Sequence, residues 1–179
     1  MTRAGIAPVA ASAVGNILEH VTRALAIVGG LILVGLAIMT VCSILGRAFI
    51  FAGLSPVKGD YEMVEMGCAI AIFCFLPLCQ MRRGHVTVDV FINVFPARVR
   101  IFLSLLGNTA LFLAAALIAW RLWLGTIDKL SYGEETYELG LPLGYSYSAA
   151  MVGAVLFAVV AFYTMWRSLN EMIVGEEPH

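Results

Sequence analysis

Four long stretches of uncharged and mostly apolar residues divide the chain, and charged residues stand at the edges of each stretch. The stretches cover residues 24–46, 66–81, 101–120 and 139–166. An α-helix rises about 1.5 Å per residue, so roughly 20 residues are needed to cross about 30 Å of hydrocarbon. The first, third and fourth stretches therefore predict membrane-spanning helices by their length alone.

The second stretch is shorter, and it needs residues from its N-terminal flank to complete a span. Its sixteen residues cover only about 24 Å. We expect this helix to begin near Asp60, which places Glu62 and Glu65 at or just inside one interface. Negative charge is favourable at a helix N-terminus, which is sufficient to explain Asp60 and Glu62. For Glu65 we expect either an ion pair with Arg47 or Arg121, or a carboxylate that reaches the lipid headgroups.

The predicted fold class is an all-α integral membrane protein with one membrane domain over residues 1–179. The predicted segments are spans at 24–46, 61–82, 99–122 and 144–168, an outer loop at 123–143 and a tail at 169–179. Residues 12–23 have apolar positions at helical spacing, and they form either an interfacial arm helix or an extension of the first span. Residues 86–95 are apolar but too short to cross. An interfacial arm helix satisfies their backbone hydrogen bonds better than an isolated strand does.

The composition supports a membrane protein. Hydrophobic residues make up 61% of the chain and charged residues 13%, and the mean hydropathy is +0.92. These values lie outside the range of ordinary soluble domains. The first stretch is longer than the apolar region of a signal peptide, so we interpret it as a retained span. We expect lipids as neighbours and no nucleic acid partner.

The basic residues favour one orientation. With both termini in the cytoplasm, seven basic residues lie inside and four outside, as the positive-inside rule prefers. The inside residues are Arg3, Arg23, Arg82, Arg83, Arg98, Arg100 and Arg167, and the outside residues are Arg47, Lys58, Arg121 and Lys129. Both termini are therefore predicted to be cytoplasmic, and the loop between the third and fourth spans is predicted to lie outside.

No motif of a known catalytic or cofactor site is present. The sequence lacks a glycine-rich phosphate loop, an HExxH motif, a paired CxxC motif and a nucleophile elbow. His20, His85 and His179 lie outside the predicted spans, so haem ligation between helices is not expected. The four cysteines are expected to be small packing residues, because free cysteine is often buried. We predict that the chain is not an enzyme and has no cofactor and no metal site.

No predicted span carries Asp, Glu, Lys, Arg or His near its centre, where such residues usually mark an ion or substrate pathway. Small and uncharged polar residues within the spans are instead predicted to pack helices together. These are Gly29, Gly30, Gly35, Thr40, Ser43, Ser104, Asn108, Thr109, Ser146, Ser148 and Thr164. Pro77 frees the carbonyl of Phe73, which then needs another donor or shielding by neighbouring protein. That need hints at a partner along this helix.

Two segments and one loop carry a pattern typical of one family. The segments are residues 56–62 (PVKGDYE) and 76–89 (LPLCQMRRGHVTVD), and the loop contains Glu135-Thr136, Leu139 and Leu141-Pro142 before the fourth span. Residues 82–89 are the most specific part. With the layout of four spans, this pattern resembles the small membrane subunit, DctQ type or Q subunit, of tripartite ATP-independent periplasmic (TRAP) transporters.

The resemblance implies a scaffold in the bacterial inner membrane. It implies a large M subunit (DctM type) that carries substrate and ions, and a periplasmic P protein that binds an organic anion such as a carboxylate. Candidate structural or partner-interface residues are Arg47, Asp60, Glu62, Glu65, Pro77, Arg82, Arg83 and Asp89. Candidate residues for docking the P protein are Glu134, Glu135 and Glu138, since rim charges mostly affect association rate.

Two other classes of membrane protein are alternatives. A stand-alone four-helix exporter of small molecules needs a carboxylate inside the first span, and residues 24–46 contain none. A membrane anchor of a respiratory enzyme ordinarily has histidines within its helices, and the predicted spans contain none. The TRAP resemblance is therefore the preferred interpretation.

Overall fold

The structure, a computed structural model, describes residues 8–82 and 97–174 of the chain. Its helices are α1 (Pro8–Ala48), the short 3-10 helix η1 (Ile50–Ala52), α2 (Asp60–Met81), α4 (Ala97–Tyr132) and α5 (Leu143–Val174). Each of the four α-helices is long and apolar enough to cross a membrane, and the described residues contain no β-strand beyond one isolated bridge. The predicted fold class of four membrane-length helices is confirmed.

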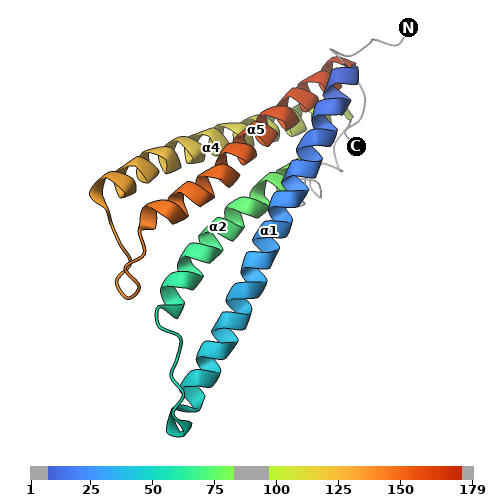
Figure 1. The fold of residues 1–179 in the computed structure, drawn as a ribbon. Coiled ribbons are helices and arrows are strands. Elements are labelled where there is room, and N and C mark those ends of the chain that lie inside the picture. Colours follow the sequence, from blue (N-terminus) through green and yellow to red (C-terminus); the bar gives the residue numbers. More distant parts are fainter. Residues whose placement is uncertain (1–7, 83–96, 175–179) are drawn as a thin grey trace.

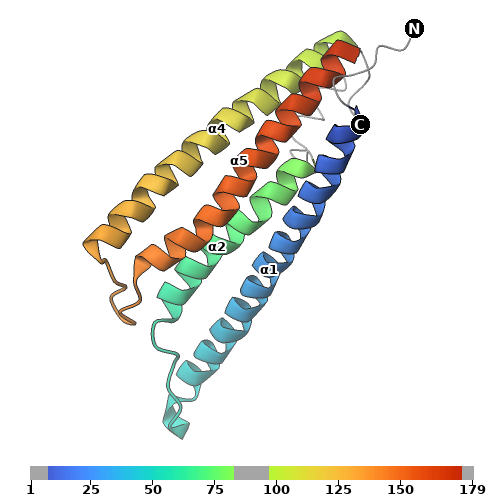
Figure 2. The ribbon, with the colours of Figure 1, turned by 45° about the horizontal axis from the view of Figure 1, so that its top comes forward.

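The four α-helices lie side by side in one row, in the order α4, α5, α2, α1 (Figure 1; Figure 2). The neighbours α5 and α2 run in the same direction, and the outer helices α4 and α1 run in the opposite one. We call the end with the connections 49–59 and 133–142 the loop end, and the end where α1 begins and α5 finishes the terminal end. The helices lie close together at the terminal end and spread apart toward the loop end. Because the row is a single layer, many large apolar side chains on its helices are not covered by any other described residue.

Small residues allow neighbouring helices to approach closely. Gly29 of α1 contacts α2, because a Cβ atom at Gly29 would lie 2.8 Å from the Cβ of Cys74. In lipid such close packing replaces the hydrophobic driving force between helices. Gly29 thus packs as predicted. Gly30 and Gly35 do not, because no described atom lies within 4 Å of a Cβ built at either position.

The helix α2 continues through Pro77 without ending. A proline ring cannot donate a hydrogen bond to the carbonyl four residues earlier, which here belongs to Phe73. Gly153 of α5 lies against this carbonyl, since a Cβ atom at Gly153 would be only 2.3 Å from the Phe73 oxygen. The predicted shielding is therefore present, and it comes from α5 of the same chain rather than from a partner protein.

The helices α1, α4 and α5 are longer than the predicted spans, whereas α2 has the length predicted for residues 61–82, shifted by one residue. Residues 123–132, predicted in the outer loop, continue α4 through Gly125, and the helix ends at Tyr132, just before Gly133, which has a φ of 61°. Residues 12–23 extend the first span, since α1 is a single helix of 41 residues. At about 1.5 Å per residue α1 is roughly 60 Å long, about twice the hydrocarbon thickness. The predicted arm helix at 86–95 lies outside the described residues.

The contact between Gly153 and Phe73 predicts a strong effect of one added methyl group. Gly153→Ala should force α2 and α5 apart and lower the free energy of unfolding by about 1–3 kcal/mol, as expected for overpacking. The thermal midpoint of the purified chain in detergent measures this loss. Gly35→Ala is the matched control, because its Cβ would meet no atom within 4 Å. An unchanged midpoint for Gly153→Ala would contradict the proposed packing.

Candidate functional site

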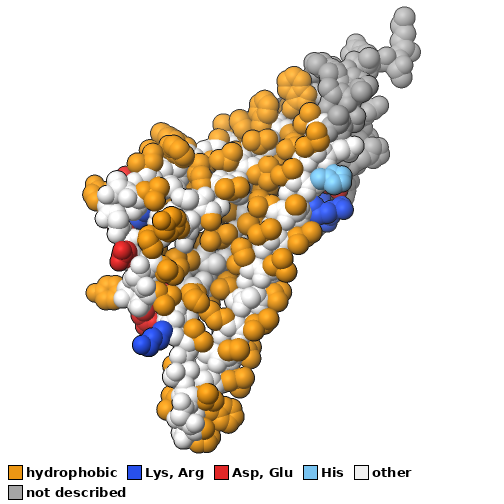
Figure 3. Space-filling view, in the orientation of Figure 1, with side chains coloured by type: hydrophobic (Ala, Val, Ile, Leu, Met, Phe, Trp, Pro, Cys, Tyr) orange, Lys and Arg blue, Asp and Glu red, His pale blue; other side chains and the backbone are white. Residues whose placement is uncertain are grey.

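Charged side chains lie near the two ends of the helical row. In the face shown in Figure 3, hydrophobic side chains cover the region between these ends. The buried polar residues of the described part are all uncharged, namely Thr22, Ser43, Gln80, Asn108, Thr126, Thr164 and Ser168. Within the residues described, no group of three or more His, Cys, Asp or Glu side chains could hold a metal ion. The candidate functional features are therefore contacts between helices and surfaces at the two ends.

A buried cluster of four polar side chains joins three helices near the terminal end. We call Gln80, Asn108, Thr164 and Ser168 the polar cluster. Gln80 Nε2 donates to Thr164 Oγ1 at 2.8 Å and to Asn108 Oδ1 at 3.4 Å. Asn108 Nδ2 donates to Ser168 Oγ at 2.7 Å. Because each of these residues is at most 8% exposed, the hydrogen bonds fix the relative positions of α2, α4 and α5.

The sequence indicated half of the polar cluster. Asn108 and Thr164 were predicted as packing residues, whereas Gln80 and Ser168 were not recognised as their partners. A usable signal was present, because Thr164 and Ser168 are four residues apart and therefore lie on one helix face. Three other predicted packing residues form hydrogen bonds within their own helix instead of with a neighbouring helix. The hydroxyls of Thr40, Thr109 and Ser148 each donate to the carbonyl four residues earlier.

Asp60 connects the start of α2 to α1 at the loop end. Ser43 Oγ donates to Asp60 Oδ2 at 2.5 Å, and Arg47 Nη2 lies 3.3 Å from the same oxygen. Ser43 is buried, while Arg47 is exposed. Arg47 therefore pairs with Asp60 and not with Glu65. Among the described residues no ion pair within 4.0 Å includes Glu65, so of the two alternatives expected for this residue the pair with Arg47 or Arg121 is not formed.

Glu62 connects α2 to the loop 133–142. Its carboxylate accepts hydrogen bonds from the backbone N–H groups of Glu138 at 2.7 Å and Leu139 at 3.1 Å. In return, Glu138 Oε2 accepts a hydrogen bond from the N–H of Gly59 at 2.8 Å. Gly59 has a φ of 68°, and its open side is filled by Leu139. These reciprocal contacts hold the two connections of the loop end together.

The three acidic residues predicted to dock a partner have different surroundings. Glu134 forms an ion pair with Lys129, and Glu138 is bonded to Gly59. Glu135 is exposed on the loop, near the fully exposed Tyr137. The loop is closed by Thr136, whose N–H donates to the Leu141 carbonyl at 2.9 Å. Of the three candidates, Glu135 is therefore the one whose carboxylate forms neither an ion pair nor a hydrogen bond among the described residues.

Three predicted residues belong to the segment that follows α2. Arg82 forms the C-terminal cap of this helix, with its N–H donating to the Leu78 carbonyl at 3.1 Å, and its side chain is exposed. Arg83 and Asp89 lie outside the described residues. The structure thus brings Arg47, Asp60 and Glu62 together at one end of α2, far from Arg82 at the other.

These features define a multi-pass membrane protein built from helix packing and end contacts. Residues 36–171, more than half of the chain, match the family described as tripartite ATP-independent periplasmic transporters, DctQ component. The chain belongs to this family, and it is thus a small Q subunit of a TRAP transporter. The match covers α2, α4 and most of α5. Comparisons with curated proteins and with solved structures gave no match.

The polar cluster predicts a loss of stability when its central donor is removed. Gln80→Leu keeps a side chain of similar size but leaves Asn108 and Thr164 without their shared donor. The expected loss is about 1 kcal/mol, in the range of hydrogen bonds measured between membrane helices. Thermal unfolding in detergent should show it, whereas Cys79→Ala, at the neighbouring exposed position, should have no effect. Equal midpoints for Gln80→Leu and wild type would show that the cluster does not stabilise the helices.

Proposed function

We propose that this chain is the scaffold subunit that pairs with the large M subunit of a TRAP transporter. The complex takes up an organic anion, which we propose to be a carboxylate. A periplasmic P protein delivers the anion, and an ion gradient drives its uptake. In this proposal the M subunit carries the substrate and the coupling ion. The Q subunit supplies a fixed frame in the membrane.

The observation that carries the proposal is the single row of helices without a charged interior. In the most apolar 18-residue stretch of α1 only 11% of the residues are buried, and in the corresponding stretch of α5 39% are buried. The exposed area must be covered by lipid or by other membrane proteins, and a flat row can lie against a second bundle over a wide area. The buried polar residues are all uncharged within the described part, which supports a role in support rather than in transport.

We further propose that the loop end faces the periplasm of a bacterial inner membrane. The excess of basic residues at the other side supports cytoplasmic termini. The contacts of Asp60 and Glu62 then stiffen the frame on the side where the P protein arrives. Pro77 is buried against α5, so its contribution to a partner interface is indirect. Arg82, Arg83 and Asp89 remain candidates for contact with the M subunit on the cytoplasmic side.

Co-purification tests the pairing. The tagged chain, expressed together with a candidate large M subunit from the same genome, should retain that protein through size-exclusion chromatography in detergent. An unrelated four-span membrane protein with the same tag is the control and should not retain it. Uptake into liposomes should require both membrane subunits and the P protein. Solute accumulation by liposomes that contain this chain alone would overturn the proposal.

Charge reversal at Glu135 tests the docking of the P protein. Glu135→Lys should slow association of the P protein several-fold at low salt, with a smaller effect at high salt, because rim charges act mainly on the association rate. Glu19→Lys at the terminal end changes the net charge equally and should have no effect. Glu138 is unsuitable for this test, since its carboxylate holds Gly59. An unchanged rate and salt dependence for Glu135→Lys would exclude docking through this residue.

A further inference from the structure

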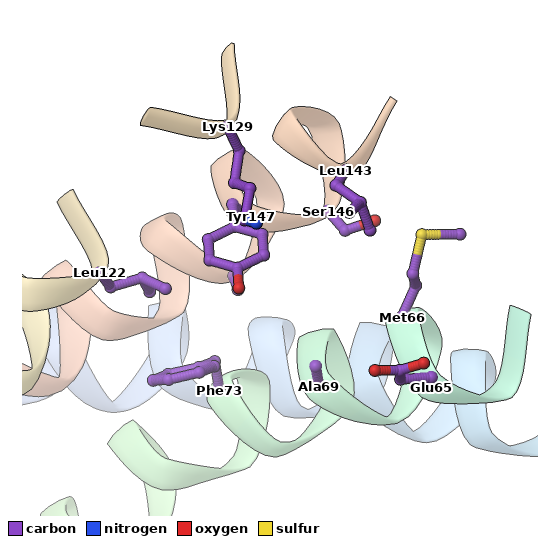
Figure 4. A pocket seen from close by; sticks show the side chains of 10 residues that line it. Glu65, Met66, Ala69, Phe73, Leu122, Lys129, Leu143, Ser146 and Tyr147 are labelled. Carbon is purple, nitrogen blue, oxygen red and sulfur yellow. The ribbon is translucent and has the colours of Figure 1, made fainter. Parts of the chain in front are cut away.

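A groove of about 450 Å³ runs between α2 and α4, with α5 as its floor (Figure 4). It exists because α4 and α2 flank α5 in the row and spread apart toward the loop end. We call this cavity the lateral groove. Glu65 of α2, Lys129 of α4, and Ser146 and Tyr147 of α5 contribute polar groups to it.

The lateral groove is polar at one end and apolar toward the other. Its polar residues lie near the loop-end termini of their helices, since α2 begins at Asp60, α4 ends at Tyr132 and α5 begins at Leu143. Phe73 and Leu122 line it deeper, at roughly 10–12 Å along their helices from Glu65 and Lys129. A polar mouth at the membrane boundary and an apolar interior toward the bilayer centre fit an amphiphile with its headgroup at the mouth.

The charges at the mouth restrict the headgroup. Glu65 is exposed and belongs to no ion pair among the described residues. The Lys129 side chain extends into the lateral groove beside the Tyr147 ring, and its ammonium group also pairs with Glu134. The carboxylate of Glu65 and that of Glu134, beside Lys129, outnumber the single ammonium group at the mouth. The resulting net negative charge disfavours an anionic headgroup. A headgroup with both a phosphate and a cation complements Lys129 and Glu65 at once.

We propose that the lateral groove binds a zwitterionic phospholipid with a primary ammonium group, in the leaflet at the loop end. Its phosphate contacts Lys129, and its ammonium group contacts Glu65. A primary ammonium donates hydrogen bonds to a carboxylate, whereas a trimethylammonium group has no N–H to donate. The hydroxyls of Ser146 and Tyr147 supply further donors, and the acyl chains follow Phe73 and Leu122 toward the bilayer centre. This site does not depend on the pairing with the M subunit.

Native mass spectrometry of the purified full chain tests the lipid class. Phosphatidylethanolamine, phosphatidylcholine and phosphatidylglycerol with identical acyl chains are added separately. We expect the ethanolamine lipid to bind about tenfold more tightly than the other two, the size of one charge-assisted hydrogen bond. Glu65→Gln should reduce its affinity to that of the choline lipid, and Lys129→Gln should weaken binding of all three.

Asp128→Asn is the matched control, because Asp128 neighbours Lys129 but does not line the lateral groove. It should leave all three affinities unchanged. Circular dichroism and size exclusion verify that each variant is folded. Equal affinities of wild type for the three lipids, or an unchanged preference in Glu65→Gln, would overturn the proposal.

A photo-crosslinking amino acid at Leu122 distinguishes lipid from protein as the occupant. In membranes that contain the whole transporter, crosslinking to phospholipid supports the proposal. Crosslinking to another polypeptide would overturn it, since the lateral groove would then be a contact between subunits. This outcome is independent of whether the M subunit co-purifies.

Discussion

Hydrocarbon offers no hydrogen-bond partner, and this constraint explains most of the contacts that hold the helices together. Gln80 is fully buried among α2, α4 and α5, and its amide is satisfied by Thr164 and Asn108. The carbonyl of Phe73, released by Pro77, is instead covered by the backbone of Gly153. Either group would be costly if it faced lipid. The same requirement therefore sets both the lateral position and the axial register of α5 against α2.

The row is stabilised by different chemistry along its length. At the terminal end the polar cluster joins three helices, and in the middle small residues such as Ala71, Ala115 and Ala161 allow close approach. At the loop end the contacts are made by charged groups, since Asp60 binds α1 and Glu62 binds the loop 133–142. This order follows the polarity of a bilayer, because ionised groups are tolerated near headgroups and not at the centre. A thin layer held at both ends suits the proposed role of the chain as a frame.

The sequence predicted the number and type of the helices because uncharged stretches of sufficient length have few alternatives. It did not predict which helices are neighbours. In lipid every side of a helix can be apolar, so periodicity does not identify the face toward another helix. The Glu65–Arg47 pair, one of two alternatives for Glu65, is not formed, since Arg47 pairs with Asp60 five residues earlier in α2. The Gln80–Thr164 contact joins residues 84 positions apart, beyond any local pattern. Asp128 and Lys129 suggested a loop, although only Gly133 ends the helix.

The acidic residues at the loop end form two groups, those that bind a partner within the chain and those that form no ion pair. Asp60, Glu62, Glu134 and Glu138 each bind a partner within the chain, so their charges are already compensated by the fold. Glu65 and Glu135 form no ion pair among the described residues. A charge left uncompensated at a membrane boundary contributes nothing to the fold, yet it attracts a complementary group from outside. Glu65 lines the lateral groove, and Glu135 is exposed on the loop 133–142. The two residues are therefore suited to different ligands, a lipid headgroup for the first and a protein surface for the second.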